Sequence, residues 1–265
     1  MKAYPTDSIR NVALVSHANA GKTSLVEALL FNAKAVERLG KVDAGTATAD
    51  FDSRERDRGV SIGAALCAFE HAGVKINALD TPGYADFIAE AISCLRVADG
   101  AVVLVDATAG VEVGTERTWR YCDHYELPRL IVINKLDKES ANFADCVSAI
   151  RQRLSNRAVP IHVPIGSAAS FQGFVDLVEM KAFTAAGEMG PATAGEIPAD
   201  MAGAIEEARM ALVEGVAESD DTLLEKYLDT GELSADEVRN ALLDAVRSGG
   251  LVPILCASAT RNIGA

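Results

Sequence analysis

The sequence predicts an α/β fold, with a mixed, mostly parallel sheet and a smaller α+β subdomain inserted into it. Two observations support this prediction. Short apolar runs alternate with segments whose apolar residues recur at helical spacing, beginning with residues 11–16 and 22–31, and such alternation is typical of parallel sheets covered on both faces. The alternation stops near Asn156, where two short apolar segments and then three acidic helical segments follow.

The first part of the chain accounts for most of the expected parallel sheet. Residues 11–16 form a strand that leads through a loop into a helix at 22–31, and residues 60–69 and 74–80 read as two strands joined by a His-Ala-Gly turn. Buried strands and helices then alternate. We expect strands at 100–107 and 129–135, and helices at 86–98, 115–127 and 143–154. Residues 38–59 are polar and lack periodicity, so we expect a functional or mobile segment there.

The second part predicts the inserted subdomain. Its strands are expected at 159–166 and 174–185, and its helices, after a Gly/Pro/Ala-rich connection at 187–198, at 199–217, 221–228 and 234–247. Residues 251–258 read as a buried strand that returns to the first sheet. Because no further helix follows, we expect one face near residues 251–256 to be partly uncovered.

Composition limits the class of protein. The chain has 265 residues, 49% of them hydrophobic, which suffices for a sizeable core. Its five cysteines are widely spaced and suggest neither a disulfide framework nor a zinc site. With no apolar run long enough for a signal peptide or a membrane span, we expect a cytoplasmic protein.

The net charge of −13 is concentrated in one region. Residues 185–246 contain 15 acidic and three basic residues. An acidic surface repels phosphate backbones, so we expect no sequence-specific nucleic-acid binding by this chain. Two interpretations of the acidic region stay open: a solvated helical face, or a surface for a basic protein.

Residues 16–23, Ser-His-Ala-Asn-Ala-Gly-Lys-Thr, follow a strand and open a helix, which is the context of a phosphate-binding loop. In such a loop, backbone N–H groups surround the phosphates, Lys22 neutralises them and the Thr23 hydroxyl binds Mg²⁺. The expected nucleotide-contacting residues here are Ser16, His17, Ala18, Asn19, Ala20, Gly21, Lys22, Thr23 and Ser24. The loop departs from the strict pattern at its first position, which is Ser16 and not glycine.

Three further motifs end predicted strands. Asp80 can hold Mg²⁺, and the N–H of Gly83 can reach a γ-phosphate. Asn134, Lys135 and Asp137 form an Asn-Lys-Leu-Asp motif in which the Asp137 carboxylate accepts hydrogen bonds from guanine, a pairing that adenine lacks. Ser258, Ala259 and Thr260 can present a backbone N–H to the guanine O6. Open α/β sheets bind ligands at these strand ends, so the motifs together predict a GTP/GDP site.

The chain resembles the translational GTPases, and most closely the N-terminal portion of elongation factor G and its paralogues. The resemblance covers essentially the whole chain, and the sequences that carry it are RNVALVSHANAGKT, RDRGVSI, DTPGYADF, VGTERTWRY, PRLIVINKLDK, PADM, LLEKYL and CASATRNIG. It implies a P-loop GTPase domain at 1–157 and 248–265, with an inserted subdomain at 158–247 like that of elongation factor G. It also implies that the chain is a fragment, because relatives continue through further domains.

The resemblance further implies a role on the ribosome. The expected ligands are GTP or GDP with Mg²⁺, held by Thr23, Ser61 and Asp80. Ser61 stands where the family usually has threonine, and it keeps the hydroxyl needed for Mg²⁺. Asn19 replaces a common aspartate; a hydrogen bond within the loop and a potassium site are both compatible with it. The expected partner of the full protein is the large ribosomal subunit, through its sarcin-ricin loop and stalk proteins.

Tyr84 departs most from the family pattern, because elongation factors normally have a histidine there that positions the attacking water. A phenol also donates and accepts hydrogen bonds, but with an ordinary pKa of about 10 it cannot become a cation. We therefore expect nucleotide binding to be intact, whereas the tyrosine bears on the hydrolytic step. The expected catalytic residues are Tyr84, Lys22 and Gly83. Some paralogues described as elongation factor G-like carry this tyrosine.

Three functions are compatible with these features. The first is a ribosome-coupled GTPase whose hydrolysis is very slow in this fragment. The second is a GTP-binding switch that does not hydrolyse GTP, and the third is a GTPase of the ribosomal protection or release-factor type. We also expect residues 38–59 to be disordered without GTP, because the γ-phosphate and Mg²⁺ are what order such segments.

Overall fold

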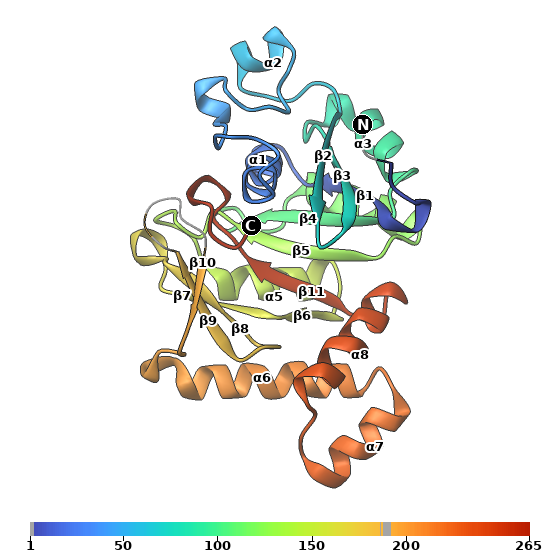
Figure 1. Ribbon diagram of the computed structural model, residues 1–265, viewed down its shortest axis with the longest axis vertical. Helices are drawn as coiled ribbons and strands as arrows, with labels where there is room; N and C mark the ends of the chain where they lie inside the picture. The colour runs from blue at the N-terminus through green and yellow to red at the C-terminus, as the bar shows by residue number, and fades with distance from the viewer. Residues whose placement is uncertain (1–2, 186, 188–191) are drawn as a thin grey trace.

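The computed structural model describes residues 3–185, 187 and 192–265, and within them the larger sheet has seven strands. Their order is β2-β3-β1-β4-β5-β11-β6. All neighbours are parallel except β2 and β3, which confirms the predicted mixed, mostly parallel sheet (Figure 1). The strands are β1 (Ile9–Val15), β2 (Ala65–His71), β3 (Val74–Asp80), β4 (Gly100–Asp106), β5 (Arg129–Asn134), β6 (Ala158–Pro160) and β11 (Val252–Cys256).

The antiparallel pair is set by its turn. Ala72 and Gly73 both have positive φ angles, of 48° and 81°. A two-residue turn of this kind matches the twist of paired strands and therefore joins β2 to β3 as a hairpin.

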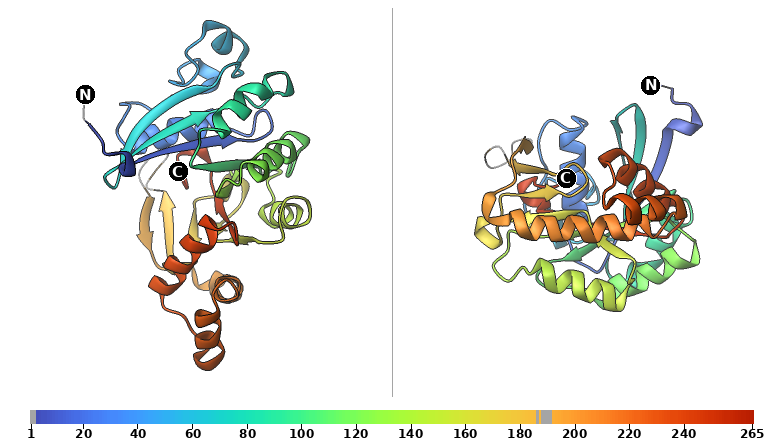
Figure 2. Two further views of the ribbon diagram at one scale, coloured as in Figure 1. Left: turned by 90° about the vertical axis from the view of Figure 1, so that its right-hand side faces the viewer. Right: turned by 90° about the horizontal axis from the view of Figure 1, so that it is seen from below.

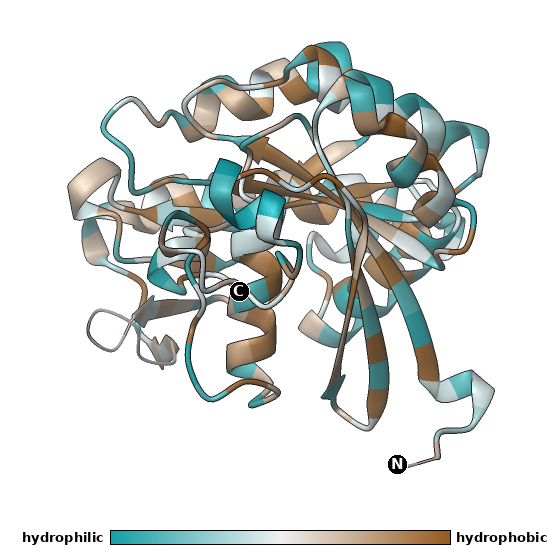
Figure 3. Cartoon of the chain, turned by 90° about the horizontal axis from the view of Figure 1, so that it is seen from above, coloured by the Kyte–Doolittle hydropathy of each residue, from teal (hydrophilic) through white to brown (hydrophobic). Residues whose placement is uncertain are grey.

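Helices cover both faces of this sheet. α1 (Lys22–Asn32) packs on the face that carries Leu14 and Leu104. α3 (Ile88–Leu95), α4 (Val113–His124) and α5 (Phe143–Arg153) pack on the opposite face, with Val103 and Ile131. Because successive side chains of a strand point to opposite faces, each central strand contributes to both clusters. The central strands are accordingly mostly hydrophobic in Figure 3, whereas the helices carry both hydrophobic and hydrophilic residues.

A second, antiparallel sheet has the order β10-β9-β8-β7 within the described residues. Its strands are β7 (His162–Ile165), β8 (Gly173–Asp176), β9 (Lys181–Ala185) and β10 (Ala192–Gly195), followed by helices α6 (Ala202–Ala217), α7 (Asp221–Thr230) and α8 (Ala235–Arg247). α6 runs across this end of the molecule and α7 lies at its extremity (Figures 1 and 2). Val175, Leu212 and Val238 belong to a hydrophobic cluster separate from the two clusters of the larger sheet.

The structure corrects two details of the expected strands. The segment 159–166 does not lie wholly in the smaller sheet, because β6 pairs with β11 in the larger one and only β7 joins the smaller one. The expected partly uncovered face of β11 is limited to one residue: Val252, Ile254 and Cys256 are buried in a cluster with residues of α4 and α5, whereas Leu255 is half-buried on the α1 side. β11 is an inner strand, between β5 and β6.

The segment 38–59 contains a short helix that its lack of periodicity did not predict. This helix, α2 (Ser53–Arg58), begins with a capping box formed by Asp52 and Glu55. Asp followed three residues later by Glu is a recognisable helix start, so the sequence held this signal. Six short 3-10 helices complete the structure described: Thr6–Ser8, Val42–Ala44, Ala85–Phe87, Ala168–Ser170, Ala199–Met201 and Ala259–Arg261.

No helix within the described residues has the length and apolar character needed to cross a lipid bilayer.

Candidate nucleotide-binding site

The loop between β1 and α1 has the geometry of an anion cradle. Gly21 caps α1 with a φ of 93°, and Asn19 also has a positive φ, of 63°. No backbone hydrogen bond from the N–H groups of Ala18, Asn19 or Gly21 is found within the described part of the chain. Unpaired N–H groups beside a helix N-terminus form a favourable site for phosphate.

Lys22 lies inside this loop. Its ammonium donates to the Ser16 hydroxyl at 2.9 Å and to the His17 carbonyl at 3.1 Å. Burial lowers the pKa of Lys22 to about 8, and the nearby Asp80 carboxylate opposes that shift. A phosphate group in the cradle would favour the charged form of Lys22.

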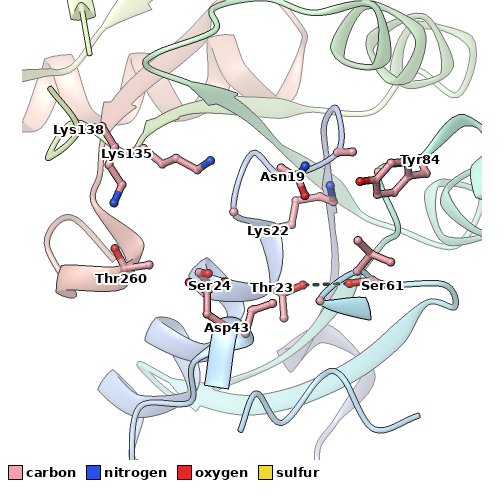
Figure 4. A pocket seen from close by; sticks show the side chains of 16 residues that line it. Asn19, Lys22, Thr23, Ser24, Asp43, Ser61, Tyr84, Lys135, Lys138 and Thr260 are labelled. Carbon is pink, nitrogen blue, oxygen red and sulfur yellow. Dashed lines mark hydrogen bonds between the residues drawn. The ribbon is translucent and has the colours of Figure 1, made fainter. Parts of the chain in front are cut away.

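Three oxygen ligands converge beside the loop. The Thr23 hydroxyl donates to Asp80 Oδ2 at 2.7 Å and lies 3.2 Å from the Ser61 hydroxyl oxygen (Figure 4). Asp80 is 2% exposed, and its second carboxylate oxygen, Oδ1, is buried and has no hydrogen-bond partner among the described residues. Burial raises the pKa of Asp80 to about 6, against the hydrogen bond from Thr23. Hydroxyl and carboxylate oxygens are the ligands that Mg²⁺ prefers, so these residues fit the ion.

Asp50 joins this cluster, and sequence analysis did not single it out. Its Oδ1 accepts a hydrogen bond from the Ser61 hydroxyl at 3.2 Å, and burial raises its pKa. Nothing in the local pattern of residues 38–59 indicated this contact.

The opposite end of the site is braced by Asn134. Its amide donates to the Ala20 carbonyl at 2.9 Å and accepts from the Ala259 N–H at 3.0 Å. One side chain thus joins the phosphate-binding loop, the end of β5 and the loop after β11. A Cβ on Gly21 would lie 2.4 Å from this amide, so a larger residue would displace Asn134.

Asp137 is fixed by the loop after β11. The Ser258 hydroxyl donates to Asp137 Oδ1 at 2.7 Å, and Lys138 lies 3.7 Å from Oδ2. Lys135 forms an ion pair with Asp106 at 2.7 Å and also lines the pocket. Since the N–H groups of Ser258 and Ala259 are engaged by Ile263 and Asn134, Thr260 is the residue of the three best placed to offer an N–H to a base.

Tyr84 stands at the phosphate end of the same pocket. The pocket has a volume of about 320 Å³, within the usual range for ligand sites. Figure 4 shows the Tyr84 hydroxyl pointing toward the loop, on the side of Lys22, while Lys135, Lys138 and Thr260 occupy the opposite end. Tyr84 is 40% exposed, so its ring is not part of the core.

Gly83 approaches the loop closely. A Cβ at this position would lie 2.6 Å from the Lys22 ammonium nitrogen and 2.6 Å from the Ala18 Cα. Only glycine therefore allows the segment after β3 to pack against the phosphate-binding loop. Val42 and Asp43 also line the pocket, and no pattern in the sequence had indicated them.

His17 turns its ring toward the start of α4. Its Nδ1 accepts from the Gly114 N–H at 3.2 Å, and its Nε2 lies 3.4 Å from the Glu112 carboxylate. The contribution of His17 to the nucleotide end of the site is its backbone carbonyl, which holds Lys22.

Comparison with known proteins decides the family. The model of the elongation factor Tu GTP binding domain matches residues 7–265. The chain belongs to this family. Its members are translational GTPases with a GTP-binding domain.

A solved structure agrees with the fold of this family. A crystal structure of a protein from Thermus thermophilus matches with a TM-score of 0.90 and 35% sequence identity. The match covers 97% of this chain and 38% of that one. The translational GTPase domain described here therefore spans well under half the length of that relative.

Proposed function

We propose that this chain is the nucleotide-binding domain of an elongation factor G-like translational GTPase that hydrolyses GTP with Mg²⁺ when coupled to the ribosome. The observation that carries the proposal is the convergence of the Asp80, Thr23 and Ser61 oxygens beside Lys22, at one end of a pocket. Lys135, Lys138 and Thr260 line the other end, and Asp137, the proposed base-recognition residue, lies beside Lys138 and is held by Ser258. The second sheet and the acidic helices, which come between β6 and β11 in the chain, support the elongation factor G-like assignment.

The division into a GTPase domain at 1–157 and 248–265 and an insertion at 158–247 is part of this proposal. β6 extends the larger sheet by three residues beyond the first boundary. The insertion then has its own sheet and its own hydrophobic cluster.

Different residues would bind the phosphates, the base and the metal ion. The loop N–H groups and Lys22 hold the phosphates, and the Asp137 carboxylate accepts hydrogen bonds from guanine while Ser258 fixes its orientation. Thr23 and Ser61 would ligate Mg²⁺, and Asp80 would hold it through water. The ion would supply charge neutralisation to the phosphate oxygens.

Hydrolysis depends on the arrangement of water at the γ-phosphate. Gly83 would offer its N–H to that phosphate, and the Tyr84 hydroxyl can orient water by donating and accepting. Phosphoryl transfer depends mostly on positioning and electrostatic stabilisation, so a neutral phenol can contribute to the first but supplies no positive charge. We therefore expect slow turnover by this chain alone and stimulation of the intact protein by the large ribosomal subunit.

Partners are proposed at the level of chemistry. The acidic helices α6, α7 and α8 fit a basic protein surface, and stalk proteins of the large subunit are the candidates that the family resemblance suggests. A role on ribosomes would place the protein in the cytoplasm.

Calorimetric titration of this chain with GDP, a non-hydrolysable GTP analogue and ATP, each with and without Mg²⁺, tests the binding claim. We expect guanine nucleotides to bind and ATP not to compete. Equal affinity for ATP would contradict the role of Asp137. GTP turnover by the intact protein, with and without ribosomes, tests the catalytic claim.

A second function is favoured by one observation, the tyrosine at position 84. In this alternative the domain is a GTP-binding switch that does not hydrolyse its ligand. Ribosome-stimulated turnover in the intact protein would exclude it.

A further inference from the structure

One buried carboxylate of α1 takes no part in the nucleotide site described above. Glu27 is 0% exposed and follows Thr23 by four residues, so both side chains lie on the same face of the helix. Its Oε1 accepts from the Thr48 N–H at 2.5 Å and the Ala49 N–H at 3.3 Å, and its Oε2 accepts from the Thr48 hydroxyl at 3.2 Å. The helix that carries Thr23 therefore also holds the backbone at 48–49.

Gly40 shows how closely this carboxylate is enclosed. A Cβ at Gly40 would lie 2.3 Å from Glu27 Oε2 and 2.7 Å from the Thr46 carbonyl oxygen. The two ends of the segment, at 40 and at 46–49, thus both pack around Glu27.

A second buried carboxylate holds the other side of Ser61. Glu55 is 3% exposed and comes from α2, and its Oε1 accepts from the Ile62 N–H at 2.8 Å and the Gly63 N–H at 3.0 Å. Within the described residues neither Glu27 nor Glu55 forms an ion pair. Backbone N–H groups are thus the main partners that satisfy these two buried charges.

The residues between the two carboxylates lead to the proposed Mg²⁺ ligands. Asp50 follows directly after the backbone held by Glu27 and accepts from the Ser61 hydroxyl. Ser61 directly precedes the backbone held by Glu55 and lies 3.2 Å from the Thr23 hydroxyl.

We infer that Glu27 and Glu55 are positioning residues that hold Ser61 in the arrangement needed to bind Mg²⁺ with GTP. The inference rests on the proposed function, because it assigns Ser61 to the GTP-bound state. Loss of either carboxylate would lower the fraction of molecules whose segment 48–63 is in the binding-competent arrangement. The apparent affinity for a GTP analogue falls by that fraction, whereas GDP, which does not need Ser61, is affected little.

Amide hydrogen exchange on this chain tests the contacts directly. Glu27→Gln keeps the side-chain length but removes the charge, so we expect exchange about tenfold faster or more at Thr48 and Ala49. Glu55→Gln should do the same at Ile62 and Gly63. Each variant is the matched control of the other, and Asp57→Asn, on the exposed side of α2, should change neither pair.

Gly40→Ala provides an independent route to the same effect. The added methyl group would displace the Glu27 carboxylate without changing its charge. We expect the exchange pattern of Glu27→Gln, with the β1 and β4 amides unaffected. Faster exchange throughout the chain in all three variants would overturn the inference, because it would indicate a general loss of stability.

Calorimetry with Mg²⁺ and either GDP or a non-hydrolysable GTP analogue gives the functional readout. We expect about a tenfold loss of analogue affinity in Glu27→Gln and Glu55→Gln, with GDP affinity changed less than about twofold. Equal losses for both ligands, or no loss for the analogue, would refute the positioning role. If the unmodified chain itself bound neither ligand, the proposed function would fail, and that result is separate from any effect of the variants.

Discussion

Asp137→Asn tests whether one carboxylate gives this domain its preference for guanine. Asp137 Oδ1 already accepts one hydrogen bond, from the buried Ser258 hydroxyl at 2.7 Å. The remaining lone pairs of the carboxylate are free to accept from the N1–H and 2-amino groups of guanine. An asparagine would keep the shape of the side chain but present an amide NH₂ group to one of these donors.

The expected magnitude follows from the number of bonds lost. A hydrogen bond to a charged group contributes about 1.5–3 kcal/mol, so two such bonds contribute about 3–6 kcal/mol. This corresponds to a loss of about 10² to 10⁴ in GDP affinity. Xanthine carries a carbonyl oxygen where guanine has its amino group, so xanthosine diphosphate should bind Asp137→Asn better than GDP does.

Calorimetric titration of both proteins with GDP and xanthosine diphosphate measures this exchange of preference. Ser258→Ala is a milder comparison variant, because it removes the hydroxyl that orients Asp137 but keeps the carboxylate charge. We expect it to lose about tenfold in GDP affinity without gaining affinity for xanthosine diphosphate. Unchanged GDP affinity in Asp137→Asn would refute the assigned role.

Three further predictions concern the metal, the catalytic step and acid stability. Asp80→Asn should reduce the dependence of GTP-analogue affinity on Mg²⁺, measured with and without a chelator; an undiminished Mg²⁺ effect would contradict the role given to Asp80. In the intact protein with ribosomes, Tyr84→Phe should lower GTP turnover about tenfold or more with nucleotide affinity unchanged, and equal turnover would exclude a role for the phenol in orienting water. Burial lowers the pKa of His162 to about 4, opposed by Asp176, and its side chain is 7% exposed. The unfolded chain therefore binds a proton at His162 more readily than the folded protein does. The contribution of neutral His162 to the free energy of unfolding is fully present above about pH 6.5, and up to about 3 kcal/mol of it is lost as the pH falls toward 4. Thermal melts of wild type and His162→Phe across this range should differ in slope, since phenylalanine can stack on Phe174 as the imidazole does but cannot titrate. Parallel slopes would show that His162 is not responsible.

Much of the fold followed from patterns within short segments. The apolar runs predicted the strands of the larger sheet, and the motifs at their ends predicted which loops would meet, because the carboxyl ends of parallel strands share one edge of the sheet. The helix α2 was missed although its capping signal was present, since a six-residue helix is too short to show periodicity. The expectation of an uncovered face on β11 considered only the next element in sequence. Residues of α1, α4 and α5 belong to the clusters that contain this strand, so the exposure is confined to the half-buried Leu255.

The sequence by itself therefore determined the class of fold, and it proposed the place of the phosphate-binding loop and of the base-recognition motif. Only the tertiary structure decided how these parts support one another. Asn134 and the Ala20 carbonyl are 114 residues apart, and Ser258 and Asp137 are 121 apart. Glu27 and Thr48 are closer in sequence, but they meet only because a loop without periodicity folds back over α1. Local patterns depend on neighbours along the chain, whereas such contacts depend on packing, which no short segment specifies alone.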